Sequence, residues 1–214
     1  MTLKAVLFDC DGVLVDSEPA AFELIGEELA AHGLHLSHEE LEAHFVGGTI
    51  HIVFEKSRAM GADLPDGWVD HFYEKLYARL AKGTALFPGV EALLDALDWA
   101  GIKYAVGSNG TQRKMRTTLG QHLSVWDRLQ GNLFSGQELG CPKPDPALYL
   151  TAAKSLGVAP ENCVVVDDSA TGCQGGLNAK MRTIGFASGK REGLDALGIE
   201  VARDMSELRE LLGI

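Results

Sequence analysis

A short apolar run that ends in acids places the tightest limit on how this chain can fold. Lys4 to Phe8 reads as a β-strand, and Asp9, Asp11 and Asp16 follow it within eight residues. In extended backbone Asp9 and Asp11 point to the same side, and Gly12 lets the chain turn sharply behind them. Open α/β sheets bind their ligands at the carboxyl ends of the strands. The run therefore predicts a ligand site at the end of a buried strand.

From Glu18 onward the apolar residues recur at helical spacing. Helices are expected from residue 18 to a stop at 32–33, from 41 to 45 behind a capping box at 37–40, and at 49–60 and 66–81. We expect Gly47-Gly48 and the 82–84 linker to act as lid and hinge points. Because no strand pattern occurs between residues 18 and 83, the sequence predicts a helical domain at 18–83, inserted into a core domain formed by 1–17 and 84–214.

Strands and helices alternate through the rest of the chain. Strands are expected at 103–107, 132–135, 163–166, 182–186 and, at an edge, 199–202; helices are expected at 90–100, 111–119, near 125–129, at 145–156, at 170–179 and from 206. Such alternation is typical of a parallel sheet with helices on both faces. The predicted fold is therefore an α/β, Rossmann-like core with a small inserted α-helical domain.

The composition excludes several classes of partner. The formal charge of −11 would repel nucleic acid and an acidic membrane surface. No apolar run approaches the roughly 18 residues that a membrane span needs, and the segment before the first Asp is too short for a signal peptide. Four cysteines without a CxxC pair indicate reduced thiols. We expect a cytoplasmic protein, a monomer or small homo-oligomer, that binds neither nucleic acid nor membrane.

Four loops carry reactive or polar side chains, and three of these loops follow a predicted strand. They contain Asp9 and Asp11, Ser108 and Asn109, Lys143, and Asp167 and Asp168. In a parallel sheet, residues 9, 108 and 167 converge at one edge. Four carboxylates beside one lysine cannot all stay ionised unless a cation lies among them. Because the donors are oxygens and no His or Cys is placed to help, we expect Mg²⁺ rather than zinc.

The same loops resemble, in order and spacing, the four motifs of the haloacid dehalogenase superfamily of Asp-nucleophile phosphohydrolases. Motif I is similar to Asp9-x-Asp11-Gly12, motif II to Ser108-Asn109, motif III to Lys143 in Lys-Pro-Asp-Pro, and motif IV to Asp167-Asp168-Ser169. The helical insert resembles the small C1-type cap of the superfamily. The resemblance implies a Mg²⁺-dependent phosphoric monoester hydrolase whose partner is a small phosphorylated metabolite.

The resemblance also assigns roles to the acids. Asp9 would attack phosphorus and form an aspartyl-phosphate, with Asp11 as general acid and then general base. Mg²⁺ would be held by Asp9, the Asp11 carbonyl and Asp168, with Asp167 supporting it directly or through water. The plainer alternative for Asp167 and Asp168 is that they cap the next helix, and we expect them to do both.

Three further residues would hold the oxygens of the transferred phosphoryl group. These are Ser108, the Asn109 backbone and Lys143, which would stabilise the negative charge there. Taken alone, Ser108 and Asn109 could be only the N-cap of the following helix, and Lys143 could be a surface lysine in a turn. Their occurrence in order with the other motifs favours the functional interpretation.

Departures from the superfamily bear on the substrate. Ala20 and the 47–50 region stand where β-phosphoglucomutase-like members carry a hinge His and a cap-loop Arg, which disfavours a phosphosugar mutase. Residues 18–83 contain five Lys or Arg against twelve Asp or Glu. This balance favours a hydroxyl-rich leaving group, as in a sugar phosphate or a sugar-acid phosphate such as phosphogluconate. The alternatives are such a mutase and a non-enzymatic ligand-binding protein on the same fold.

One departure bears on stability. The helix after motif IV usually ends in Ala-Gly-Met in the superfamily, whereas here it ends in Ala179-Lys180-Met181. A lysine in a left-handed C-terminal cap would carry strain on the order of 1 kcal/mol.

Overall fold

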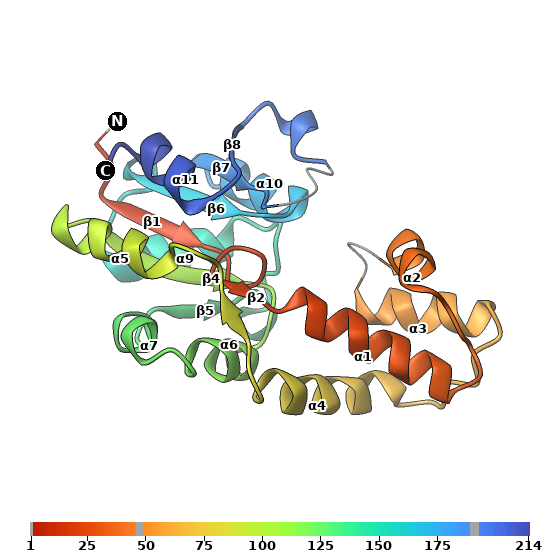
Figure 1. The fold of residues 1–214 in the computed structure, drawn as a ribbon. Helices are drawn as coiled ribbons and strands as arrows, with labels where there is room; N and C mark the ends of the chain where they lie inside the picture. The colour runs from red at the N-terminus through yellow and green to blue at the C-terminus, as the bar shows by residue number, and fades with distance from the viewer. Residues whose placement is uncertain (1, 46–48, 189–192) are drawn as a thin grey trace. The chain divides into compact units, whose positions relative to one another are not determined.

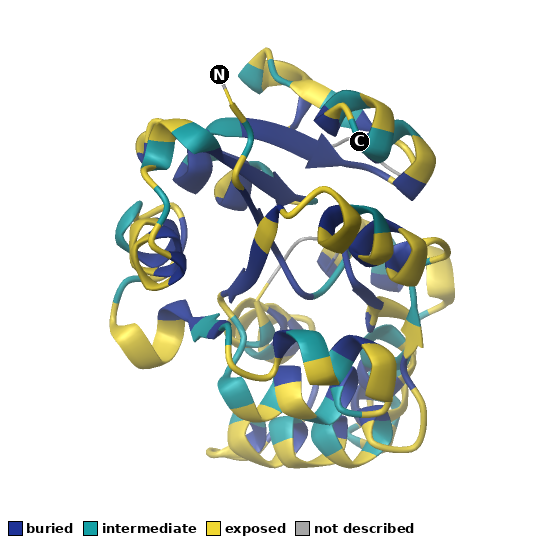
Figure 2. Cartoon of the chain, turned by 90° about the vertical axis from the view of Figure 1, so that its left-hand side faces the viewer, coloured by how far each residue is buried: buried dark blue, intermediate teal, exposed yellow. Residues whose placement is uncertain are grey.

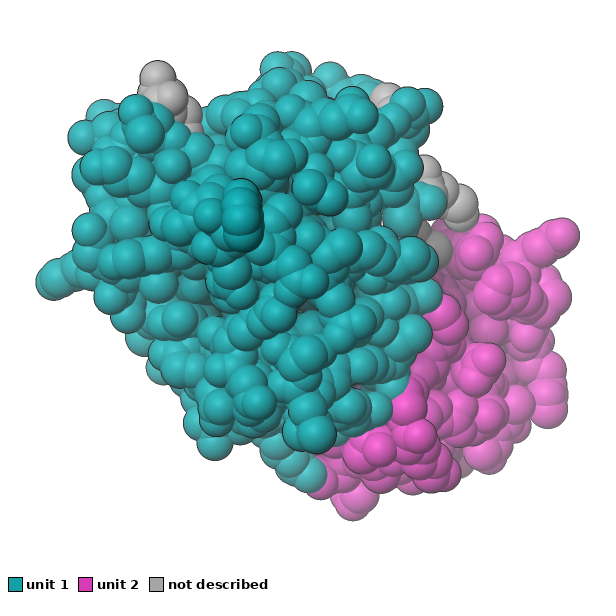
Figure 3. Space-filling view, turned by 60° about the vertical axis from the view of Figure 1, so that its left-hand side comes forward, with its two compact units in different colours: residues 1–16, 84–214 teal, residues 17–83 magenta. Residues whose placement is uncertain are grey.

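The computed structural model describes residues 2–45, 49–188 and 193–214. The chain separates into two compact units, Met1–Asp16 with Thr84–Ile214 and Ser17–Gly83, which Figure 3 shows in different colours. We call them the α/β unit and the helical unit. No helix within the described ranges is long and apolar enough to cross a membrane.

A six-stranded sheet organises the α/β unit, and all of its neighbouring strands are parallel (Figure 1). In sheet order the strands are β5 (Leu133–Ser135), β4 (Lys103–Ser108), β1 (Ala5–Phe8), β6 (Cys163–Asp167), β7 (Arg182–Phe186) and β8 (Glu200–Ala202). The apolar run at the start of the chain thus forms a central strand, paired with β4 on one side and β6 on the other.

Helices cover both faces of this sheet, and Figure 2 shows its central strands as buried. Val6 and Phe8 of β1 pack in one apolar cluster, whereas Ala5 and Leu7 pack in another, because successive strand residues point to opposite faces. The first cluster includes residues of α5 (Val90–Trp99), α6 (Gln112–Leu119), α7 (Leu123–Leu129) and α11 (Met205–Leu212); the second includes residues of α9 (Ala147–Leu156). Helix α10 (Ala170–Asn178) packs against β6 and β7. The predicted fold class is confirmed.

The helical unit has its own apolar core. In its described residues it contains α1 (Glu18–Ala31), α2 (His38–Phe45), α3 (Ile50–Ala59) and α4 (Trp68–Leu80). Helix α4 contributes Trp68 and Phe72, whose ring centroids are 5.1 Å apart. The predicted capping box is present, since Ser37 N–H donates to Glu40 Oε2 and Glu40 N–H donates to Ser37 Oγ. The predicted break at Gly47-Gly48 lies outside the described residues.

Several short elements were not predicted from the sequence. Val15–Asp16 and Ala85–Leu86 form a two-stranded antiparallel ribbon, β2 and β3. Helix α8 (Gly136–Leu139) has four residues, and two 3-10 turns lie at Pro160–Asn162 and Asp195–Leu197. Elements this short contain too few residues for a periodic pattern.

Lys180 adopts the left-handed conformation in which the sequence analysis expected a lysine to be strained. Its φ is 58°, and it is the one non-glycine residue with positive φ in the described part of the chain. Its N–H donates to the Leu177 carbonyl at 2.9 Å, as a helix end requires. A Cβ in this conformation is strained.

Replacing Lys180 with Gly should therefore stabilise the protein by about 1 kcal/mol, because the Cβ strain is removed. Urea unfolding at constant pH measures the change. Lys180→Ala is the matched control: it removes the same side chain, keeps the Cβ, and should change stability by less than about 0.5 kcal/mol. Equal effects of the two substitutions would contradict the assignment of strain to the backbone.

Candidate active site

Three of the predicted site loops begin at the carboxyl ends of adjacent strands. Phe8 is level with both Val106 of β4 and Val166 of β6, so Asp9 lies one residue beyond this row. The Asp9 N–H donates to the Val166 carbonyl at 2.8 Å, which extends the ladder by one step. Asp167, the last residue of β6, therefore lies beside Asp9. Ser108 ends β4 on the opposite side of β1.

Lys143 joins two of the strand ends. Its Nζ donates to Asp9 Oδ1 and, at 2.7 Å, to Asp167 Oδ2. The Lys143 side chain is 4% exposed, and those of Asp9 and Asp167 are 10% and 1% exposed. Lys143 comes from the segment between α8 and α9, far along the sequence from Asp9. The alternative of a surface lysine in a turn is therefore wrong.

Asn109 holds the main chain of Lys143. Its Oδ1 accepts from the Lys143 N–H at 2.8 Å, and its Nδ2 donates to the Lys143 carbonyl at 3.4 Å. The sequence assigned a role only to the Asn109 backbone. In the structure its side chain fixes the position from which Lys143 reaches the acids.

Asp167 accepts hydrogen bonds at both carboxylate oxygens. Oδ2 accepts from the Tyr149 hydroxyl at 2.6 Å as well as from Lys143, and Oδ1 accepts from the Ser169 N–H at 3.0 Å and the Ser169 Oγ at 2.8 Å. Ser169 also caps α10, because its Oγ accepts from the Gly172 N–H at 3.0 Å. Tyr149 was missed by sequence reasoning, since a tyrosine among the apolar residues of a helix carries no sign of a polar partner.

The burial of these charges changes their proton affinities. Burial raises the pKa of Asp9 from its ordinary value of 3.8 to about 7; Lys143 lowers it, but the charges of Asp167 and Asp11 add to the rise. Burial would lower the pKa of Lys143, but Asp167 and Asp9 outweigh this effect and hold it well above its ordinary value. Lys143 therefore stays protonated, and the Asp9 carboxyl has a pKa of about 7.

Asp11 and Asp168 lie at the more accessible side of the cluster. Asp11 Oδ1 forms an ion pair with Lys114 Nζ at 2.9 Å. Lys114 was not predicted from the sequence, where it is one of several basic residues on α6. Asp168 packs against Gly12: a Cβ on Gly12 would lie 2.1 Å from Asp168 Oδ2. Gly12 thus provides the close approach of motifs I and IV, besides its turn with φ of 77°.

The donor set of this cluster fits a hard divalent cation. Four carboxylates, at residues 9, 11, 167 and 168, face only two ammonium groups, at 114 and 143. Within the described residues, no three His, Cys, Asp or Glu side chains are already arranged as a metal-binding group. The expected ligand set requires only two carboxylates and one main-chain carbonyl, since Mg²⁺ keeps several waters.

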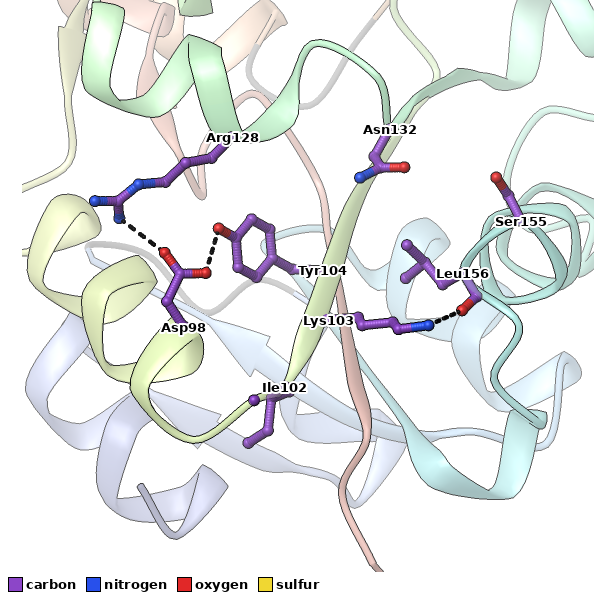
Figure 4. Close-up of a pocket in the computed structure, with 9 residues that line it drawn as sticks. Asp98, Ile102, Lys103, Tyr104, Arg128, Asn132, Ser155 and Leu156 are labelled. Atoms are coloured by element: carbon purple, nitrogen blue, oxygen red, sulfur yellow. Dashed lines mark hydrogen bonds and ion pairs between the residues drawn. The ribbon is translucent and has the colours of Figure 1, made fainter.

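A separate pocket lies at the other end of β4 and is a weaker candidate (Figure 4). Its polar groups satisfy one another: the Tyr104 hydroxyl donates to Asp98 at 2.8 Å, and Lys103 Nζ donates to the Leu156 carbonyl at 2.7 Å. Asp98 also pairs with Arg128 at 3.6 Å. The cluster at the carboxyl ends of the strands, by contrast, has more carboxylates than ammonium groups.

This chain is similar to known proteins over most of its length. A family model described as haloacid dehalogenase-like hydrolase matches residues 3–180. The 6-phosphogluconate phosphatase of Escherichia coli K12 is 35% identical over 188 residues, covering 87% of this chain and 83% of that protein. Hexitol phosphatase A of the same strain is 32% identical, with coverage of 86% and 83%. The solved structure of a hydrolase from Deinococcus radiodurans R1, with bound phosphate and sodium, has a TM-score of 0.80 and 32% identity, covering 98% of this chain and 95% of that one.

The Asp167 carboxylate occupies the space that a side chain at position 172 would need. Adding one methyl group at Gly172 should therefore have a large effect on stability. A Cβ on Gly172 would lie 1.9 Å from Asp167 Oδ2, so Gly172→Ala should displace this carboxylate and destabilise the protein by about 1–3 kcal/mol. In the control Gly175→Ala, on the same helix, the nearest atom would be 3.5 Å away, so helix propensity should leave it neutral or up to about 1 kcal/mol more stable. Urea unfolding of both variants tests this, and a stable Gly172→Ala variant would contradict it.

The raised pKa of Asp9 predicts a pH-dependent stability. Between its ordinary value of 3.8 and about 7, the folded state keeps a proton that the unfolded state has released, so the contribution of Asp9 to stability falls as pH rises through this window. The slope is at most about 1.4 kcal/mol per pH unit. The free energy of unfolding is measured for the wild type and for Asp9→Asn, both treated with chelator. Between about pH 5 and 7 the wild type should lose stability relative to the variant as the pH rises. A constant difference would contradict the shift.

Proposed function

Because the chain belongs to the haloacid dehalogenase-like hydrolase family, we propose that it is a Mg²⁺-dependent phosphatase that works through an aspartyl-phosphate on Asp9. One observation carries the proposal. Asp9 lies buried at the end of the central strand with the Lys143 ammonium on one of its oxygens, and Asp11 lies two residues further on. A nucleophile, a cation for developing charge and a second carboxyl group are thus present together.

Two displacements at phosphorus complete the reaction. In the first, an Asp9 carboxylate oxygen forms a bond to phosphorus while the bond from phosphorus to the leaving oxygen breaks, and protonated Asp11 gives its proton to that oxygen. In the second, a water oxygen forms a bond to phosphorus while the bond from the Asp9 oxygen to phosphorus breaks, Asp11 takes a proton from this water, and inorganic phosphate leaves. Asp9 and Asp11 return to their starting protonation states.

Charge on the transferring oxygens needs donors at fixed positions. Lys143 is held by its contacts with Asp9, Asp167 and the Asn109 side chain, so its ammonium does not need to reorganise during the reaction. The Ser108 side chain is buried, and its Oγ accepts from the Gly110 N–H at 3.0 Å, which leaves its hydroxyl hydrogen to be donated. Ser108, the Asn109 N–H and Lys143 together form the proposed phosphate site.

Asp9, the Asp11 carbonyl and Asp168 would hold Mg²⁺, with Asp167 supporting them. When bound, the ion supplies positive charge that neutralises Asp9 and the phosphate oxygens. The excess of carboxylates over ammonium groups in the cluster supports this assignment. Since Asp167 is already bonded to Lys143, Tyr149 and Ser169, its support for the ion is by positioning or through water.

The proposed substrate is a small phosphorylated sugar or sugar acid. Relatives at 35% and 32% identity are named 6-phosphogluconate phosphatase and hexitol phosphatase A. The helical unit would act as the cap that selects this substrate. Its excess of acids, twelve against five basic residues in 18–83, supports a hydroxyl-rich leaving group. A mutase would return phosphate to a sugar, whereas we expect water to be the acceptor.

Removing either acid of motif I should separate the two roles. Asp9→Asn should abolish turnover of all phosphate esters, because no phosphoenzyme can form, and Asp11→Asn should lower the rate by roughly 100-fold or more while sparing Mg²⁺ binding, since its carbonyl is the ligand. Phosphate release is measured on a panel of sugar phosphates, sugar-acid phosphates and p-nitrophenyl phosphate, with Mg²⁺ and with chelator. Arg116→Met on α6 is a control outside the site.

Three outcomes would contradict the proposal. Mg²⁺-dependent hydrolysis by Asp9→Asn would exclude Asp9 as the nucleophile. Transfer of phosphate to a sugar instead of water would indicate the mutase. Wild-type protein that is folded, binds Mg²⁺ and hydrolyses no member of the panel would favour a ligand-binding protein.

A further inference from the structure

Lys114 is a second lysine at the site, and it contacts Asp11 rather than Asp9. The Lys114 Nζ lies 2.9 Å from Asp11 Oδ1, and the two side chains are 20% and 23% exposed. No motif of the sequence pointed to this residue. Its partner is the carboxylate to which the proposed mechanism gives both proton transfers.

The backbone of Lys114 is fixed at the start of α6. Thr111 is the N-cap, and its Oγ1 accepts from the Lys114 N–H at 3.1 Å. The neighbouring Met115 side chain is buried in the core of the α/β unit. The main chain that carries the Lys114 ammonium is thus held in place by its neighbours, and precise positioning of Asp11 requires such support.

Helix stability does not explain a lysine at this position. A positive charge in the first turn of a helix opposes the helix dipole and is therefore unfavourable. Helix α6 has no acidic residue in its first turn to offset it. A partly exposed ion pair stabilises a protein only weakly, so the pair contributes little net stability. The placement of Lys114 is better explained by what it does to Asp11.

The orientation of Asp11 supports this explanation. Lys114 binds Oδ1, and the other oxygen faces Gly110: a Cβ added there would lie 3.7 Å from Asp11 Oδ2 and 3.3 Å from Ser108 Oγ. The same Cβ would lie 3.6 Å from Lys114 Cδ, so the three side chains gather around Gly110. Oδ2 therefore lies on the side of Ser108, where the proposed phosphate site is.

We infer that Lys114 is a positioning residue for Asp11: by binding Oδ1 it directs Oδ2 toward the leaving oxygen of the phosphate ester. The inference rests on the proposed function. It predicts that Lys114 matters most where protonation of the leaving group matters most. An alkoxide leaves poorly without a proton, whereas p-nitrophenolate leaves readily without one.

The test compares kcat/KM for two esters, because this ratio reports the steps up to formation of the phosphoenzyme. Lys114→Met should lower kcat/KM for the best alkyl phosphate of the panel by about tenfold or more, and that for p-nitrophenyl phosphate much less. Asp11→Asn should show the same dependence on the leaving group. Lys114→Arg should restore most of the alkyl-phosphate activity, since it keeps a cationic donor.

A double-mutant cycle and a charge control sharpen the result. On an Asp11→Asn background, Lys114→Met should cost little more, because residues that act as a unit are not additive. Arg116→Met removes the same charge from the same helix; its Nη2 donates to Gln112 rather than to an acid of the site, so both rates should stay unchanged. Thermal unfolding of each variant, with and without Mg²⁺, reports on folding.

Equal losses on both esters, no loss on either, or failure of Lys114→Arg to restore activity would overturn the inference. Should Lys114→Met not fold, Lys114→Gln takes its place, and failure of both neutral variants to fold would assign Lys114 a structural role and overturn it too. These results can be told apart from failure of the proposed function. If the proposed function is wrong, the wild type itself is inactive. If only the inference about Lys114 is wrong, the loss of kcat/KM in Asp11→Asn depends on the leaving group and the loss in Lys114→Met does not.

Discussion

The Lys143 ammonium between Asp9 and Asp167 is the interaction on which the site depends. All three groups are buried, and two carboxylates so close to each other could not both remain ionised without a cation. A buried ion pair of this kind is weak evidence for stability, because removing three charges from water costs several kcal/mol per ion. The surrounding structure is arranged to support it: Asn109 fixes the main chain of Lys143, and Tyr149 and Ser169 satisfy Asp167.

Sequence patterns were sufficient for the fold and for the sheet edge at which the candidate site lies, because both follow from local rules. A strand that ends in acids must place them at the carboxyl edge of a parallel sheet, and the order of the other loops then brings Ser108 and Asp167 to its two sides. The expected fold class, family and hydrolase character are confirmed. The roles of the individual residues and the binding of Mg²⁺ stay predictions, because they concern the reaction and not the fold.

What the sequence could not provide is the set of partners that reach the site from helices. Tyr149 and Lys114 lie at ordinary positions of α9 and α6, and their importance comes from tertiary contacts with Asp167 and Asp11. Gly172 is similar: a glycine is needed there because the Asp167 carboxylate occupies the space of a Cβ, and not because the chain turns. Such residues are selected by packing across the sheet edge, which leaves no periodicity or motif spacing to detect.

The two lysines of the site pair with two different acids, Lys143 with Asp9 and Lys114 with Asp11. Lys143 is almost completely buried and binds Asp9, the proposed nucleophile, which would have to keep one position throughout both displacements. Lys114 and Asp11 are partly exposed, so in the proposed mechanism Lys114 can hold Oδ1 while Oδ2 stays accessible to the leaving oxygen and then to water. A nucleophile benefits from burial in a fixed position, whereas a group that exchanges protons with a leaving oxygen and then with water must be accessible to both. The difference in burial between the two ion pairs therefore matches the difference between the two proposed roles.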